Sequence, residues 1–325
     1  MLPEFFRRVI CVKLLLLVLA AIVLFFVCVM IIDSKRFVVR TYTVQSAKIH
    51  TDRTLVFLTD LHNRTYGKKN EKLLSAIRAQ NPDAVLVGGD TIISHQARED
   101  SIRWMQVTLD LYGKIAKDYP LYFADGNHEG RLFDPREENG VSGANLLRAI
   151  DETTCHKAVY LNNRTVYLGD LAITGLDLPM DSYQKLKRTE LERGAVESLV
   201  GKADPKHFRI LLAHNPKYFE EYARWGADLV LSGHMHGGLM RFPKQRGAIA
   251  PDLSLFPPYA WGTCFLKKGS AGKSSLRAGE RKVHLPLDTC EMILSCGLGS
   301  HTLPIRIFNP GELTVVKLKG QKKQR

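Results

Sequence analysis

The sequence predicts an α/β domain with a largely internal sheet, preceded by one membrane-spanning helix. Short apolar runs of strand length recur along the chain, and helix-length segments separate several of them. Alternation of strands and helices is typical of α/β folds. Residues 14–32 form a single stretch without charge. With 45% hydrophobic and 24% charged residues, the composition excludes a disordered chain and a multi-span transporter.

The uncharged stretch at residues 14–32 is expected to be an uncleaved anchor. At a rise of 1.5 Å per residue it spans about 28 Å, close to the thickness of the bilayer hydrocarbon core. It ends in Met30-Ile31-Ile32-Asp33, which lacks the small residues of a signal-peptidase site. Residues 1–13 are expected to be a short basic tail. Basic residues flank both ends of the stretch, so the positive-inside rule leaves the orientation open.

Residues 33–49 are expected to be a linker and first strand region, 50–320 the folded domain, and 321–325 a basic tail. Apolar runs predict buried strands at 55–58, 84–87, 121–124, 171–174, 210–213, 229–231 and 292–295. Helices are predicted at 71–80, 102–117, 144–150, 185–199 and 218–224. The aromatic and proline-rich segment 253–261 is either a lid or interfacial wedge, or an ordinary packed loop.

Five of the predicted strands are followed at once by polar residues able to bind metal. In chain order these are Asp60-Leu61-His62, Gly88-Gly89-Asp90, Gly126-Asn127-His128-Glu129, His214, and Gly233-His234-Met235-His236. Ligands of α/β sheets collect at the carboxyl ends of strands, where several strands contribute side chains. A single Asp-x-His or His-x-His is commonly structural. All five in this order, each ending a strand, indicate a functional site.

Paired divalent cations would explain this mixture of carboxylate, imidazole and amide. Two such ions about 3.5–4 Å apart can hold a phosphate and offset charge on the attacking and leaving oxygens. The formal net charge of +13 likewise favours an anionic partner, such as a phosphate, a nucleotide, a nucleic acid or an acidic lipid.

These motifs resemble those of the calcineurin-like metallophosphoesterase superfamily, over about residues 50–320. The ending Gly297-Leu298-Gly299-Ser300, with Asn309-Pro310-Gly311-Glu312, is similar to the membrane-anchored YaeI- and YkuE-like bacterial branch. That branch includes the chlamydial type of UDP-2,3-diacylglucosamine pyrophosphatase. The resemblance implies a four-layer αββα sandwich.

The resemblance also implies roles for individual residues. Asp60, His62 and His236 would bind one metal ion. Asn127, His214 and His234 would bind the second, and Asp90 would bridge both. His128 would not be a ligand but would assist departure of the leaving group. Glu129 and Asp125 depart from the usual pattern, in which an Asp and an apolar residue are commoner. Manganese is expected, with iron, zinc or magnesium as alternatives, because the ligands are oxygen and nitrogen without thiolate.

The expected protein is therefore a metal-dependent phosphoester or pyrophosphate hydrolase, bound to the bacterial inner membrane by a single span. The leading substrate is UDP-2,3-diacylglucosamine, which would place the domain in the cytoplasm. The alternatives are a phosphoesterase acting on cell-envelope or phospholipid phosphoesters outside the membrane, and a non-catalytic membrane scaffold. The membrane and a lipid-linked nucleotide sugar or other phosphoester are the expected partners, and no nucleic acid is expected.

Overall fold

The structure is a computed structural model of the chain. It describes residues 4–94, 101–135, 141–184, 189–241, 247–249, 255–257, 259–268, 275–277, 282–300 and 305–320. The basic tail predicted at 321–325 lies outside the described residues, as does part of the segment 253–261.

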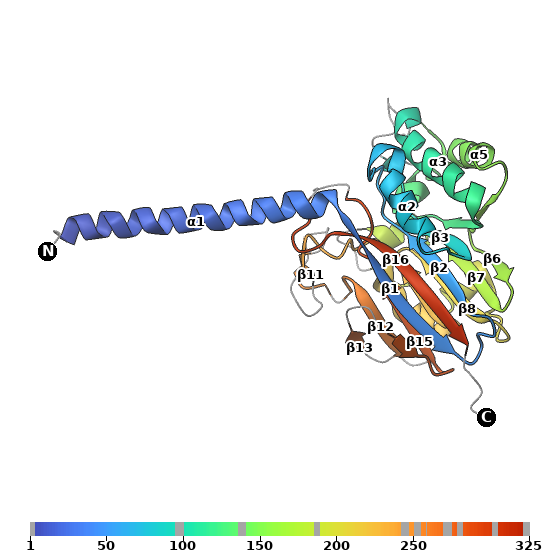
Figure 1. Ribbon diagram of the computed structural model, residues 1–325. Coiled ribbons are helices and arrows are strands. Elements are labelled where there is room, and N and C mark those ends of the chain that lie inside the picture. The colour runs from blue at the N-terminus through green and yellow to red at the C-terminus, as the bar shows by residue number, and fades with distance from the viewer. Residues whose placement is uncertain are drawn as a thin grey trace.

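The chain begins with helix α1 (Glu4–Lys35), which projects alone from the folded domain (Figure 1). It is the one helix among the described residues that is long and apolar enough to cross a membrane, and none of its apolar window is buried in the protein. Because α1 begins at Glu4, most of the basic tail predicted at residues 1–13 belongs to this helix. Only Arg36 separates α1 from the first strand. The region predicted as linker and first strand, 33–49, therefore contains the last residues of α1, then β1 and a short turn.

The first sheet has the strand order β14-β1-β16-β2-β3-β4-β5. Its strands are β1 (Phe37–Ser46), β2 (Arg53–Leu58), β3 (Ala84–Gly88), β4 (Leu121–Ala124), β5 (Ala158–Tyr160), β14 (Lys282–His284) and β16 (Gly311–Gly320). Strands β2, β3 and β4 are parallel neighbours, so their carboxyl ends meet at one edge. Strands β1 and β16 pair in parallel along their whole length, which joins the two ends of the domain.

The second sheet has the strand order β13-β12-β15-β9-β8-β7-β6. Its strands are β6 (Arg164–Leu168), β7 (Leu171–Leu176), β8 (Phe208–Ala213), β9 (Leu229–Ser232), β12 (Gly262–Lys267), β13 (Ser275–Arg277) and β15 (Thr289–Leu294). Strands β15, β9, β8 and β7 run parallel, so this sheet also has an edge of carboxyl ends. A third, two-stranded sheet pairs β10 (Met240–Arg241) with β11 (Gly247–Ile249).

The sheets pack face to face around a shared apolar core, and helices cover their outer faces. Helices α2 (Glu71–Arg78), α3 (Ser101–Asp118) and α5 (Gly143–Thr153) cover the first sheet, and α6 (Ala195–Val200) and α7 (Phe219–Trp225) cover the second. Helices α2, α3 and α5 lie together on one side of the domain (Figure 1). The short helices are η1 (Lys68–Asn70), α4 (Asn127–Arg131), η3 (Met180–Tyr183) and η4 (Pro216–Tyr218). This arrangement confirms the predicted four-layer αββα fold.

The continuous apolar runs in the sequence follow from this layering. In β2, Val56 and Leu58 pack towards the helices, whereas Leu55 and Phe57 pack between the sheets. In β8, Leu212 faces the other sheet and Leu211 faces the outer helices. Successive side chains of a strand point to opposite faces, so a strand buried on both faces is apolar throughout.

The predicted strands match observed ones to within a few residues, and one helix prediction was wrong. Residues 189–194 are not helical, and the helix predicted at 185–199 is limited to α6; residues 185–188 lie outside the described chain. Gly194 ends the non-helical segment with a φ of 85°, which a right-handed helix does not allow. Strand β16 was also missed, because Glu312 and Lys317 interrupt its apolar residues.

Candidate metal centre

The carboxyl ends of the parallel strands in both sheets meet at one place, and every predicted site residue lies there. Asp60 and His62 follow β2, Asp90 follows β3, and Asn127 and His128 begin α4 directly after β4. His214 follows β8, and His234 and His236 follow β9. The Nε2 atom of His214, from the second sheet, lies 3.2 Å from Oδ2 of Asp90, from the first. Neither sheet holds the complete set, so the site exists only once the two sheets have packed.

The site residues form three overlapping groups that could each hold a metal ion. One is His62, Asp90 and His128, and the other two triads match the predicted ligand sets. The first of these two is Asp60, His62 and His236, whose ligand atoms lie within 4.8 Å of one another. Nε2 of His62 lies 3.4 Å from Nε2 of His236 and 3.9 Å from Oδ1 of Asp60. These three residues are the ones that the motif resemblance grouped around one ion.

The second triad is Asp90, His214 and His234, again with ligand atoms within 4.8 Å of one another. Among the described residues, Oδ1 of Asn127 is buried and has no hydrogen-bond partner. A buried carbonyl oxygen without a partner is costly, and a cation would satisfy it. Oδ2 of Asp90 lies 3.8 Å from Nε2 of His62 in the first triad, which is a suitable place for a bridging carboxylate.

Five of the seven predicted ligands have left-handed backbone conformations. Their φ angles are 51° for Asp60, 47° for His62, 53° for Asp90, 72° for His234 and 52° for His236. Such conformations are strained in residues with a side chain, and they cluster at functional sites. Each one follows the end of a buried strand. The sheets therefore hold these residues in a geometry that isolated peptides would avoid.

Backbone carbonyls orient three of the histidines with Nε2 towards the site. The Nδ1–H of His62 donates to the carbonyl oxygen of Ile92 (3.2 Å). In the same way His214 donates to Gly88 (2.7 Å) and His236 to Gly299 (3.1 Å). A carbonyl can only accept, so in the neutral ring Nδ1 carries the proton and Nε2 keeps a lone pair. This arrangement is typical of metal-binding histidines.

In His128 the proton lies on the other ring nitrogen. Its Nδ1 accepts a hydrogen bond of 3.1 Å from the backbone N–H of Ser94, so Nε2 carries the proton of the neutral ring. A protonated nitrogen cannot bind a metal ion but can donate to an oxygen. The His128 backbone N–H also donates to Oδ1 of Asp90, at 2.8 Å. This proton position supports the prediction that His128 is a donor and not a ligand.

Burial and mutual repulsion shape the ionisation of the carboxylates. Burial raises the pKa of Asp60 to about 7, and the Asp90 carboxylate contributes to the rise. Although burial favours its neutral acid, the His214 imidazole lowers the pKa of Asp90 well below the usual value. Burial opposes the charged form of His214 as well, yet Asp90 raises the pKa of His214 to about 10. In the protein without metal, Asp90 and His214 therefore form an ion pair.

Glu129 supports the site, a role that the sequence did not reveal. Its carboxylate is buried and accepts the backbone N–H groups of Asp90 (2.7 Å), Thr91 (2.8 Å) and Gly126 (3.0 Å). It thereby joins the loop after β3 to the loop after β4. The close fit extends to Gly126, where an added Cβ would lie 2.2 Å from Oδ1 of Asp90.

Asn309 and Arg306 support the loop of the two histidines from the other side. Nδ2 of Asn309 donates to the carbonyl oxygens of His236 (2.7 Å) and Gly238 (2.6 Å). The buried guanidinium of Arg306 donates to the carbonyl oxygens of Cys296 and Gly299. Gly299 in turn accepts from His236. Both residues are far in sequence from the five strand-end motifs, and the fold brings them to the site.

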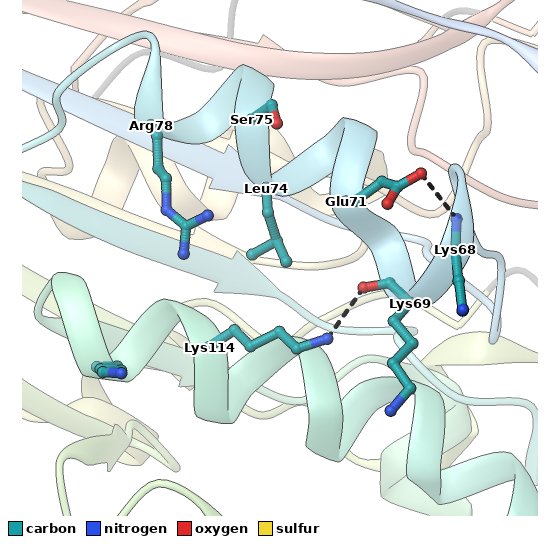
Figure 2. Close-up of a pocket in the computed structure, with 8 residues that line it drawn as sticks. Lys68, Lys69, Glu71, Leu74, Ser75, Arg78 and Lys114 are labelled. Atoms are coloured by element: carbon teal, nitrogen blue, oxygen red, sulfur yellow. Dashed lines mark hydrogen bonds between the residues drawn. The ribbon is translucent and has the colours of Figure 1, made fainter.

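The described residues also line a basic cavity of about 460 Å³ in the outer helical layer, between α2 and α3 (Figure 2). Its lining consists of Lys68, Lys69, Glu71, Leu74, Ser75, Arg78, Lys114 and Lys117. Lys114 Nζ donates to the backbone carbonyl oxygen of Lys69, at 3.2 Å. The cavity shares no residue with the metal centre.

Comparison with known proteins adds to this geometry. The family model of the calcineurin-like phosphoesterases matches residues 53–238, a segment that contains all seven predicted ligands and His128. The chain is 28% identical over 289 residues to the metallophosphoesterase Cj0846 of Campylobacter jejuni, covering 87% of this chain and 64% of that protein.

Two further relatives carry informative names. The phosphodiesterase YaeI of Escherichia coli is 26% identical over 201 residues, covering 61% of this chain and 65% of its own. A zebrafish transmembrane protein with a metallophosphoesterase domain is 25% identical over 269 residues, covering 82% of this chain and 53% of its own. The chain thus spans between half and two thirds of the length of these three relatives.

Proposed function

Because this chain belongs to the calcineurin-like phosphoesterase family, we propose that its phosphoester hydrolysis is directed at UDP-2,3-diacylglucosamine. The reaction would cleave the diphosphate to give UMP and 2,3-diacylglucosamine 1-phosphate. The observation that carries the proposal is the joining of an apolar helix to a phosphoesterase domain with a candidate metal centre. An amphiphilic phosphoester that stays in the bilayer would be within reach of such a site.

The side chains of the site fit a pair of divalent ions. One ion would be held by Asp60, His62 and His236, the other by Asn127, His214 and His234, with Asp90 between them. The lone pairs at Nε2 and the unpaired oxygen of Asn127 favour this assignment. When bound, such ions neutralise phosphate charge and make water more acidic. The ligands contain no thiolate, which favours manganese, with iron, zinc and magnesium as alternatives.

His128 would act on the leaving group. Ser94 fixes its ring with the Nε2 proton available, and the ring lies beside His62, with centroids 5.0 Å apart. For the proposed substrate, Nε2–H would stabilise the phosphate oxygen that departs when the diphosphate breaks. Imidazole suits this task because its unperturbed pKa, about 6.5, lies near neutrality.

The test is a direct assay with the lipid. Full-length protein in detergent, supplied with manganese, is incubated with UDP-2,3-diacylglucosamine, and UMP is measured. Release of UMP that Asp90→Ala abolishes supports the proposal. Hydrolysis of p-nitrophenyl phosphoesters without UMP release contradicts it and favours a phosphoesterase of other cell-envelope lipids. A chain with neither activity and no bound metal would be a scaffold.

The proposed substrate also requires the domain on the cytoplasmic face of the bacterial inner membrane, where UDP-sugars are made. A reporter fused after Arg325 tests this orientation. A signal from a cytoplasmic reporter is expected. A signal from an extracytoplasmic reporter contradicts the UDP-lipid substrate, while leaving the hydrolase chemistry unchanged.

A further inference from the structure

A rim of exposed apolar side chains lies beside the loop of the two metal-site histidines. Strand β10 pairs with β11 through Met240 and Ile249, and single bridges add Ile307 beside Met240 and Leu255 beside Ile249. Each of the two outer segments continues into a phenylalanine, Phe256 and Phe308. We refer to Leu255, Phe256 and Phe308 as the apolar rim.

The rim is unusual for the surface of a folded domain. Leu255 is 68% exposed, Phe256 57% and Phe308 41%. Among the described residues beyond α1, the other exposed large apolar side chains are Val39, Phe133, Tyr167 and Leu287, which are 37–58% exposed. The three exposed side chains flank one small sheet, Leu255 and Phe256 on the side of β11 and Phe308 on the side of β10. Exposed apolar patches on a folded domain mark interaction sites.

The contact between Phe308 and α1 indicates what this patch meets. The Phe308 ring lies 6.3 Å from that of Phe25 and 6.2 Å from that of Phe26, between centroids. Phe26 lies six residues before Ile32, the last residue of the uncharged stretch. At the helical rise, this is roughly 9 Å inside the end of the apolar segment. If α1 crosses the bilayer, Phe308 therefore lies within the hydrocarbon layer and not in the water outside it.

The backbone of the rim is strained at both aromatic residues. Phe256 has a φ of 50° and Phe308 a φ of 54°. A left-handed conformation is a genuine outlier for so bulky a residue, and outliers of this kind cluster at functional segments. Both rings remain exposed in this conformation, although burial in the domain would normally be favourable for a phenylalanine side chain.

Hydrogen bonds join the rim to both α1 and the metal centre. The Asp33 carboxylate, near the end of α1, is 3% exposed and accepts the backbone N–H of Asn309 at 2.9 Å. The side chain of Asn309 holds the carbonyls of His236 and Gly238. Asn309, the residue after Phe308, therefore links the end of the anchor to the histidine loop.

We propose that the apolar rim inserts into the bilayer leaflet that α1 enters, and that it seats the metal centre against the lipid surface. The occupant of the rim is the acyl-chain layer. A phosphoester substrate would then come from that leaflet, a consequence that rests on the proposed function. Insertion itself depends on the anchor and the rim, and not on which phosphoester is cleaved.

The test measures depth in the membrane with the full chain. Phe308→Trp and Phe256→Trp are each reconstituted in phosphatidylcholine vesicles, with or without bromine on the lipid chains, which quenches tryptophan emission on contact. Emission of the parent, which has three tryptophans, is subtracted. The matched control is Tyr167→Trp in β6, 57% exposed and outside the rim. Quenching about twofold or more above that of the control is expected for both rim variants.

Equal quenching at the rim and the control overturns the proposal. Each variant is first required to unfold at the temperature of the parent, and Leu255→Trp replaces one that does not. Emission that responds to protein concentration and not to brominated lipid would assign the rim to a second copy of the chain, and would also overturn the proposal. Quenching requires no turnover. Quenching without release of UMP would therefore contradict the proposed substrate alone.

Discussion

Two regions of this protein could attract a phosphate, and they are built in opposite ways. In the metal centre, Asp60, Asp90 and His214 are buried, and backbone groups fix their orientation. In the basic cavity, Lys68 and Lys69 are exposed, and each carries its ammonium group at the end of a long, flexible side chain. Buried polar groups are costly unless they are satisfied, whereas a surface lysine is satisfied by water. The contrast identifies the metal centre as the preorganised site.

Replacing Asp90 by alanine should have the largest effect. This carboxylate lies near both triads and holds the backbone of His128, so its loss should reduce turnover to background and lower the bound metal. Elemental analysis and hydrolysis of a p-nitrophenyl phosphoester measure both. Full metal content in Asp90→Ala would show that the carboxylate is not a shared ligand.

His128→Ala should slow turnover by roughly 10²–10⁴-fold, the usual contribution of a general acid. Because Nε2 of this residue carries a proton, both ions should remain bound. The comparison is made on the same two measurements as for Asp90. If the His128 variant lost metal to the same extent as Asp90→Ala, the role of donor would be refuted.

Glu129→Gln should have an intermediate effect. The amide keeps the size of the side chain but brings an NH₂ group against backbone donors, in place of a carboxylate oxygen. Loss of such supporting contacts costs about 10–100-fold in metal affinity or activity. Metal titration followed by activity measures the shift. Unchanged affinity would show that packing alone holds the two loops together.

Metal binding should depend on pH. Without metal, folded Asp60 and His214 keep protons up to pKa values of about 7 and about 10, above the unfolded values of 3.8 and 6.5. The folded state then binds more protons than the unfolded state, so the free energy of unfolding should fall as pH rises from about 5 to 9. Ions compete with those protons, so manganese should raise the unfolding temperature more at pH 8 than at pH 6. Thermal unfolding with and without chelator checks this, and a metal effect that shrinks with pH would contradict it.

The smallest effect is expected in the basic cavity. Lys114→Ala combined with Lys69→Ala removes two exposed or half-buried cations and should change turnover by less than about twofold. Kinetics of the double variant on the lipid and on a simple ester measure the change. A selective loss of activity on the lipid would show that this cavity, too, takes part in binding.

The candidate ligands could be found from sequence because a chemical requirement and a geometric one coincide. A buried strand must be apolar, so the change from Leu55–Leu58 to Asp60 and His62 marks the strand end where ligands collect. The same pattern locates Asp90 and His214. Glu129 was visible only as a departure from a motif. Asn309 was visible only as part of the C-terminal motif. Its support of the histidine loop was not predicted, because its partner carbonyls belong to residues some seventy positions away.

The sequence alone determined the apolar helix, the alternation of strands and helices, and the polar residues at the strand ends, since these depend on local hydrophobicity and residue chemistry. The four-layer arrangement and the roles of single residues followed from the family resemblance. Tertiary structure decided the rest: the pairing of β1 with β16, the two triads, the proton position on each histidine and the contact of Phe308 with α1. These features depend on groups distant in the chain, and only the tertiary fold brings such groups into contact.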